Sequence, residues 1–129
     1  MKVKFNCDYQ LSQISYKLGY TKETKFNFRD DSCYFVYGIS IWNNALHYLL
    51  IEQEGDLPSW YPAEIFSCCE SSLPINWHHK FYGYENDTGI IAVWGYKELV
   101  ESQQHYIGLL ERESCDIEIF LQRKSEILA

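Results

Sequence analysis

The sequence predicts an α+β fold: an antiparallel sheet of about four or more strands, built from two hairpins, with helices on one face and a helical C-terminus. Three observations lead to this prediction. Two β-rich hairpins occupy the middle of the chain, a proline-led helix is expected between them, and the last third has helical periodicity. A length of 129 residues with 47% hydrophobic side chains suits a single domain, which we take as 1–129.

Residues 1–32 are the part of the chain whose structure the sequence specifies least. Apolar side chains alternate over 3–7, which suggests a short strand. Residues 9–18 have apolar positions at roughly helical spacing, and Gly19 would end such a helix. The polar stretch 21–31 is expected to be a loop or an edge strand, and whether 1–32 joins the sheet or covers its open face stays an open question.

The first hairpin is expected to join strands Tyr34–Trp42 and Ala45–Glu52 through Asn43-Asn44, because asparagine tolerates the positive φ of a two-residue turn. This register pairs Ile41 with Leu46, Ile39 with Tyr48 and Tyr37 with Leu50 on an apolar face, which we expect to be buried. The opposite face pairs Trp42 with Ala45, Ser40 with His47 and Gly38 with Leu49. That face is more polar, and we expect it to be partly open.

Between the hairpins, Pro62 suits the first turn of a helix over Ala63–Glu70. The second hairpin should run from Trp77–Tyr84 through residues 85–89 to Ile90–Tyr96. One face would then carry Trp77, His79, Phe81, Ile91 and Val93. The open face would carry His78, Lys80, Tyr82, Tyr84, Ala92, Trp94 and Tyr96.

The last third of the chain reads as helical. We expect a short turn over 97–101, a helix over 103–112 and a longer helix that Ser114 caps. Acidic side chains at Asp116 and Glu118 would complement the positive end of that last helix. Helices of this pattern pack one apolar stripe against the sheet.

The net charge of −7 bears on the class of partner. Residues 32–96 hold one lysine against seven aspartates and glutamates, so the acidic character lies in the middle of the chain. Such a charge disfavours nonspecific binding to nucleic acid or to an anionic membrane surface. A basic protein partner is the natural inference, and the alternative is that the acidic side chains keep an aromatic-rich domain in solution.

No pattern of residues selects a reaction, a metal or a cofactor. Successive strand residues point to opposite faces, so His78 and His79 cannot share an ion, and we expect no metal and no cofactor. Phosphate-binding glycine motifs are absent from the sequence, and no carboxylate pair stands out as catalytic. Five cysteines, without C-x-x-C spacing or a leading apolar segment, favour a reduced cytoplasmic protein. We also expect no membrane span.

Three blocks of the sequence resemble a known group of proteins. They are W-Y-P-x-E-[IL]-F at 60–66, L-P-x-x-W at 73–77 and W-G-Y-x-E-L-V at 94–100. Over about residues 34–128 they are similar to a group of small, mostly uncharacterised bacterial proteins. The resemblance implies no catalytic residue. In style the chain also resembles the immunity partners of bacterial toxins, which implies a protein that binds and blocks a cognate toxin.

These observations combine into a leading hypothesis and two alternatives. The leading one is a non-enzymatic immunity protein whose acidic, aromatic surface binds a basic toxin. One alternative is a small-molecule-binding protein or an enzyme that uses His47, His78 and Tyr82 on the open sheet face. The other is a homodimer formed through that face. The residues expected to form the protein interface are Trp42, His47, His78, Tyr82, Glu85, Asp87, Trp94 and Tyr96.

Overall fold

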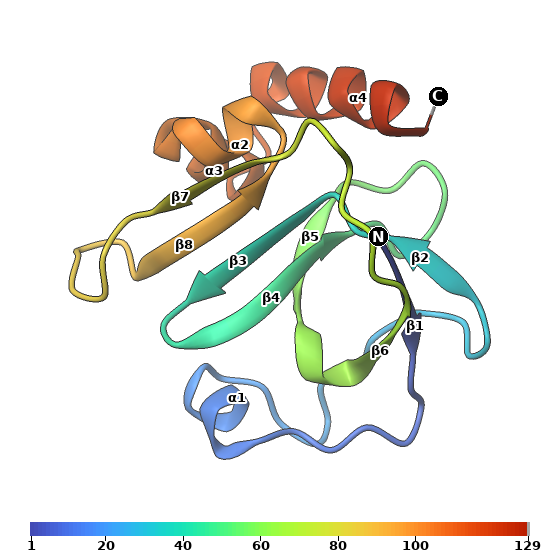
Figure 1. Cartoon of the computed structure of the whole chain (residues 1–129). Helices are drawn as coiled ribbons and strands as arrows, with labels where there is room; N and C mark the ends of the chain where they lie inside the picture. The colour runs from blue at the N-terminus through green and yellow to red at the C-terminus, as the bar shows by residue number, and fades with distance from the viewer. Residues whose placement is uncertain (129) are drawn as a thin grey trace.

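The computed structural model describes residues 1–128, which form two antiparallel sheets and four α-helices (Figure 1), and this confirms the α+β class. In chain order the elements are β1 (Lys2–Phe5), α1 (Gln13–Lys17), β2 (Cys33–Phe35), β3 (Gly38–Trp42), β4 (Ala45–Leu50), β5 (Ser59–Pro62), the 3-10 turn η1 (Ala63–Ile65), β6 (Phe66–Glu70), β7 (His78–Phe81), β8 (Ile90–Gly95), α2 (Lys97–Glu101), α3 (Gln103–Leu110) and α4 (Ser114–Leu128).

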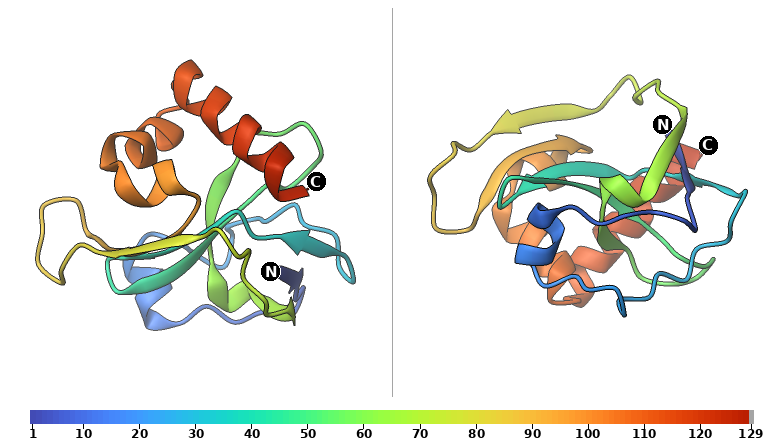
Figure 2. Two further views of the ribbon diagram at one scale, coloured as in Figure 1. Left: turned by 45° about the horizontal axis from the view of Figure 1, so that its top comes forward. Right: turned by 90° about the horizontal axis from the view of Figure 1, so that it is seen from below.

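The larger sheet has five strands in the order β5-β4-β3-β8-β7, and the smaller sheet has three in the order β2-β1-β6. Helices α2, α3 and α4 lie together on one side of the larger sheet (Figures 1 and 2), as the sequence predicts. The smaller sheet packs at one end of the larger sheet's other side. The N-terminal segment therefore contributes the central strand of the smaller sheet, and the predicted strand and helix within 1–32 are both present.

The turn between β3 and β4 has the predicted geometry. Asn43 and Asn44 both have positive φ, 48° and 67°, as a type I′ turn requires. The predicted pairs Ile41–Leu46 and Ile39–Tyr48 are confirmed. A turn of this geometry fixes the register of β3 against β4.

The predicted strand Tyr34–Trp42 is instead two strands in two sheets. The chain changes sheet at Val36 and Tyr37, whose amides donate to Met1 O and Leu49 O respectively. Val36 is buried with the smaller sheet, and Tyr37 is buried beneath the helices. Because neighbouring strand residues point to opposite sides, one step along the chain links the two hydrophobic cores.

The prediction of which face of the first hairpin is buried was wrong. On the more polar face, Ser40 and His47 are 0% and 2% exposed, because α3 covers them and Tyr106 Oη lies 2.8 Å from Ser40 Oγ. The apolar face is only partly covered, and Leu46 is 42% exposed. The smaller sheet shields the end of this face that holds Ile39 and Tyr48 and stops short of its other end.

Two glycines explain why the helices pack on the more polar face. Gly38 and Gly95 are cross-strand partners, and Leu99 of α2 lies over both of them. A Cβ at Gly38 would lie 2.5 Å from Leu99 Cδ2, and one at Gly95 would lie 2.9 Å from it. The space above these two glycines therefore receives Leu99 of α2, which is fully buried there.

The prediction for the segment between the two hairpins needs correction. The expected helix Ala63–Glu70 is a single 3-10 turn followed by strand β6, which pairs with β1. Serine and cysteine at 67–69 are weak helix formers, and pairing with the N-terminal strand overrides the proline signal. The C-terminal prediction is confirmed, with α2, α3 and α4 close to the expected bounds.

The register of the second hairpin is shifted by one residue from the prediction. His79 pairs with Trp94 and Lys80 pairs with Val93, so each predicted face mixes residues of both actual faces. The reason is that the connection runs from residue 82 to 89, longer than the predicted loop over 85–89, and that the side chain of Asn86 sets its geometry. Asn86 Oδ1 accepts from Thr88 N, Thr88 Oγ1 and Gly89 N, while Nδ2 donates to Gly83 O and Ile90 O.

The contact between Leu99 of α2 and Gly38 can be tested with a double-mutant cycle. Gly38→Ala should destabilise the chain by about 1–3 kcal/mol, because the added methyl group overpacks a buried contact with Leu99. In a Leu99→Ala background the same change should be much less destabilising, with a coupling of at least about 1 kcal/mol by denaturant unfolding. An equal effect in both backgrounds would contradict this description of the contact.

Candidate functional site

The eight residues expected to form one surface lie in five places. Trp94 is on the side of the larger sheet away from the helices, and Glu85 and Asp87 are at the tip of the β7–β8 hairpin. His78 and Tyr82 lie on the helix side of that hairpin. Tyr96 is buried beneath α4, and Trp42 and His47 border a cavity under α3. The predicted interface is therefore not one contiguous surface.

A different aromatic and apolar surface lies on the side of the larger sheet away from the helices. Phe81, Ala92, Ile41 and Leu46 form one row across four strands. In the next row His79 stacks on Trp94, with ring centroids 4.5 Å apart and planes 22° apart. We call this surface the uncovered sheet face, and it consists of Ile41, Leu46, His79, Phe81, Tyr84 and Trp94.

Two aromatic rings project most from the uncovered sheet face. Phe81 and Tyr84 are 53% and 78% exposed, and their rings meet edge to face at 5.0 Å. All four residues of β7 are exposed, and β7 is an edge strand of the larger sheet. Its outer backbone groups therefore face away from β8 and can pair with another chain.

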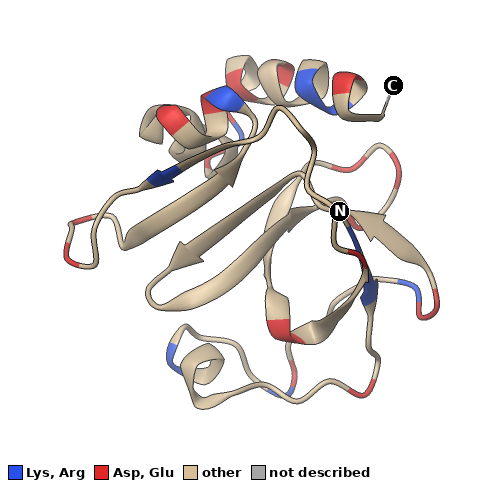
Figure 3. Ribbon diagram, in the orientation of Figure 1, with Lys and Arg blue, Asp and Glu red and all other residues tan. Residues whose placement is uncertain are grey.

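The hairpin tip beside this face is acidic. Asn86 makes the hydrogen bonds that shape the loop, so its neighbours Glu85 and Asp87 are not needed for that purpose. Both are exposed, and within residues 1–128 neither side chain takes part in an ion pair or a hydrogen bond. Figure 3 shows these acidic positions at the end of the hairpin and one basic position on β7.

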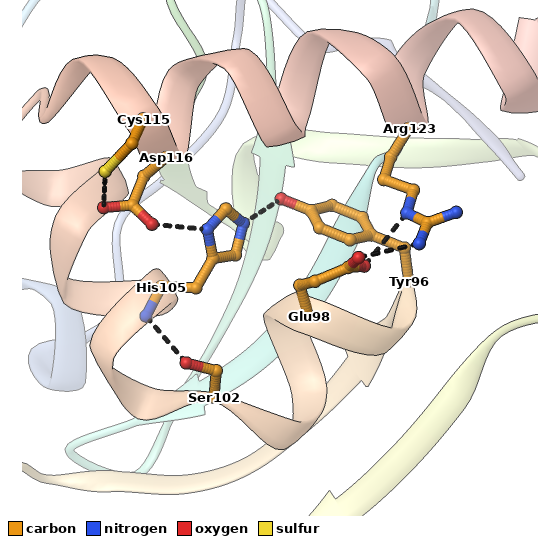
Figure 4. A network of polar contacts seen from close by, with 7 residues as sticks. All are labelled: Tyr96, Glu98, Ser102, His105, Cys115, Asp116 and Arg123. Atoms are coloured by element: carbon orange, nitrogen blue, oxygen red, sulfur yellow. Dashed lines mark hydrogen bonds and ion pairs between the residues drawn. The ribbon is translucent and has the colours of Figure 1, made fainter.

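Tyr96 belongs to a buried polar network that the sequence analysis missed (Figure 4). Its hydroxyl lies 2.7 Å from His105 Nε2, and His105 Nδ1 lies 2.8 Å from Asp116 Oδ1. Burial raises the pKa of Tyr96 well above its usual range, so the phenol keeps its proton and can donate it to His105. Asp116 also lies tightly against Gly108, where a Cβ would meet its carboxylate.

The geometry of this network joins structural elements. Tyr96 follows β8, His105 is on α3 and Asp116 is on α4, so the network links the last strand to both helices. His105 is 3% exposed and both of its ring nitrogens are engaged. A helical pattern gives no signal for such a histidine, since its partners are distant in sequence or on another helix.

A second polar contact holds α4 to α2. Arg123 donates to both carboxylate oxygens of Glu98, with Nε–Oε1 and Nη2–Oε2 distances of 2.9 and 2.7 Å (Figure 4). These hydrogen bonds, followed by the nearby positive charge, hold the pKa of Glu98 below its ordinary value of 4.5. This bidentate pair explains a carboxylate that the sequence analysis left unassigned.

Trp42 and His47 border a cavity of about 300 Å³ between the larger sheet and α3. Burial lowers the pKa of His47 below its usual range, so the imidazole is neutral at pH 7. Nδ1 lies 2.9 Å from Ala45 O, which can only accept, so Nδ1 carries the proton and Nε2 is a bare acceptor. Within residues 1–128, His47 Nε2 has no hydrogen-bond partner.

Residues 1–128 can also be searched for a metal site, a membrane-spanning helix and disulfide bonds. No three His, Cys, Asp or Glu side chains there come together in a way that could hold a metal ion. The histidines at 78 and 79 do lie on opposite faces, as strand geometry predicts. None of the helices in this part of the chain is long and apolar enough to cross a membrane. All five cysteines are free and exposed.

Comparison of the chain with protein-family models, with curated proteins and with solved structures finds no match. Argument about its function therefore rests on the surfaces and cavities described above.

The Glu98–Arg123 pair predicts a specific acid sensitivity. The carboxylate is favoured in the folded chain, so its stabilisation is complete above about pH 4.5 and is lost as pH falls through the lower folded pKa. Glu98→Gln should remove about 0.5–1 kcal/mol at pH 7 and flatten this part of the pH–stability curve. Glu23→Gln, at an exposed position outside the helices and strands, is the control and should leave the curve unchanged.

The protonation state of His47 can be read directly from NMR spectra of its imidazole nitrogens. At pH 7 we expect Nδ1 protonated and Nε2 bare, and we expect the ring to stay neutral below pH 6.5 because burial disfavours the charged form. His47→Gln assigns the signals. Protonation of His47 at or above pH 6.5 in the folded chain would contradict the buried, neutral assignment.

Proposed function

We propose that this chain is a non-enzymatic protein-binding domain, specifically an immunity protein that binds and neutralises a cognate bacterial toxin. The observation that supports it most is the uncovered sheet face, with the unpaired acidic tip of the β7–β8 hairpin beside it. The small, acidic α+β character of the chain, which resembles in style the immunity partners of bacterial toxins, agrees with this proposal.

The composition of the uncovered sheet face suits protein recognition. Aromatic side chains give large rigid contacts at little entropic cost, and they are enriched where interfaces are most strongly bound. Phe81 and Tyr84 are exposed enough to insert between side chains of a partner, while the His79–Trp94 stack offers a flat surface behind them. An exposed cluster of this kind marks an interaction site more often than a solitary exposed apolar residue does.

Charge supports a basic partner. With a net charge of −7, the chain attracts a positively charged protein over several ångströms and repels nucleic acid. Glu85 and Asp87 are free to pair with lysine or arginine because neither already has a partner within residues 1–128. In this proposal the acidic tip speeds association, and the aromatic rings and the free edge of β7 slow dissociation.

Neutralisation by this mechanism needs no chemistry in the chain. The uncovered sheet face would occupy a basic surface of the toxin, where a nucleic acid or another anionic substrate would otherwise bind. Self-association through the same face is the homodimer alternative, but it would bring two acidic tips and two net charges of −7 together. A heteromeric complex with a basic partner is therefore the better fit.

The proposal includes a cytoplasmic location. Five free, exposed thiols fit a reducing compartment, where they do not become oxidised to mixed disulfides. An immunity protein of this type would meet its toxin inside the producing cell.

The role of the acidic tip can be separated from that of overall charge. Glu85→Lys with Asp87→Lys and the control pair Glu23→Lys with Asp56→Lys both change the net charge from −7 to −3, since each substitution adds two units. An immunity protein is expected to be encoded beside its toxin, so the test uses the protein encoded next to this chain. Its binding, by surface plasmon resonance, should show at least about tenfold slower association for the hairpin pair only. Equal slowing in both variants would assign the effect to net charge.

A second pair of variants tests whether the rings of Phe81 and Tyr84 hold the partner in the complex. Phe81→Ser with Tyr84→Ser should raise the dissociation rate by at least about a hundredfold, because both rings would be buried in the complex. Thermal unfolding should change little, since both side chains are exposed. Leu73→Ser with Leu128→Ser, exposed apolar positions away from the uncovered sheet face, is the matched control. Unchanged dissociation in the Phe81/Tyr84 variant would rule out this face as the docking surface.

A further inference from the structure

The cavity beneath α3 lies on the side of the sheet opposite the proposed protein-docking surface, and that proposal does not explain its lining. Its volume is about 300 Å³, at the lower end of the range for small-molecule sites. It lies between the helix side of strands β3–β5 and the outer part of α3. Its lining residues are Tyr20, Trp42, His47, Leu49, Pro58, Ser59, Trp60, Tyr106, Leu109, Leu110 and Arg112.

Flat rings make up much of the cavity wall. Trp60 stacks on Tyr106, with centroids 5.0 Å apart and planes 20° apart. Trp42 meets the ring of His47 at 5.8 Å, and Tyr20 meets it at 6.4 Å from another direction. A planar ligand finds π-faces and edges here, the contacts that aromatic molecules favour.

Two polar atoms in this wall have no hydrogen-bond partner among residues 1–128. They are His47 Nε2 and Trp60 Nε1, and His47 is 2% exposed. Such groups are rare in native proteins, and each calls for an explanation. His47 Nε2 is a bare acceptor because Nδ1 donates to Ala45 O, while Trp60 Nε1 is always a donor. A ligand that satisfies both needs one donor and one acceptor.

A positive charge stands at the border of the cavity. Arg112 donates through Nη1 to Pro58 O and through Nη2 to Ser59 Oγ, at 2.7 Å for the second contact. In residues 1–128 no carboxylate lies within ion-pair distance of it, although the chain carries a large excess of acidic side chains. The guanidinium has further N–H groups and is available to a negatively charged ligand.

We propose that this cavity binds a small planar aromatic carboxylate. The carboxylate pairs with Arg112, the ring lies among the aromatic side chains, and a hydroxyl or N–H on the ring donates to His47 Nε2. The acceptor for Trp60 Nε1–H is an oxygen of the same ligand. The site is on the helix side of the sheet, so a ligand and a protein partner on the uncovered sheet face can be bound together.

The four tryptophan indole N–H signals in NMR spectra make a direct assay. The probes are 4-hydroxybenzoate and indole-3-acetate, with phenol and indole as neutral counterparts. At least one carboxylate should shift the Trp60 signal with a dissociation constant below about 1 mM. Trp77 and Trp94 do not line the cavity and should stay unshifted. The neutral counterpart should bind at least about tenfold more weakly, because it lacks the partner for Arg112.

Three variants locate the binding. Arg112→Met should weaken carboxylate binding at least about tenfold, while Arg29→Met, an exposed arginine that is not part of the cavity, should have no effect. Leu110→Trp should block the cavity entrance and abolish the Trp60 shift. Leu110 is 57% exposed, so this variant keeps its thermal stability and remains informative if Arg112→Met unfolds.

Several results would overturn the proposal. One is the absence of a saturable Trp60 shift with either carboxylate up to about 10 mM, which would leave the cavity to ordered water. Another is equal affinity for the neutral counterparts, which would refute the role of the carboxylate. Binding that survives Leu110→Trp would place the ligand elsewhere. None of these outcomes depends on whether a toxin partner is found.

Discussion

The contact between Leu99 and the Gly38–Gly95 pair determines which face of the larger sheet is covered. Only residues without a side chain let α2 approach the sheet this closely, and both strands provide one at the same point. Once α2 is seated, the chain runs on into α3, and Tyr106 reaches Ser40. The helix layer therefore buries the sheet face with a hydroxyl and an imidazole, and leaves half of the more apolar face without a cover.

The two candidate functional surfaces follow from this arrangement. On the covered side, α3 does not fill all the space above the sheet. The cavity that remains is lined by His47 and Trp60, whose Nε2 and Nε1 atoms have no hydrogen-bond partner among residues 1–128. On the other side, the smaller sheet covers only the end near Ile39, Tyr48 and Tyr61. The β7–β8 hairpin extends beyond it with its aromatic rings and acidic tip exposed. A protein partner and a small ligand would thus use opposite sides of one sheet.

Local patterns in the sequence correctly predicted those turns and helices that are determined by residues close together in the chain. Asn43-Asn44 predicted the β3–β4 turn and its register, and the periodicity of the last third predicted the helices. Contacts between distant segments were missed. Strand β6 forms because it pairs with β1, and His105 is held by Tyr96 and Asp116, which helical periodicity does not reveal. Of the expected interface, Glu85, Asp87 and Trp94 lie on or beside the uncovered sheet face. Tyr96 was misplaced. It is the N-cap of α2 and is buried, and apolar alternation alone does not show that the strand has ended before it.

The central claim is that the partner docks on the uncovered sheet face and not on the helices. Hydrogen–deuterium exchange of the chain, alone and mixed with the toxin that the proposal expects to be encoded beside it, tests this most directly. The proposal predicts slower exchange over residues 78–94 in the mixture, with the largest change at the outer amides of β7. Protection confined to residues 103–128, or no protection at all, would contradict it.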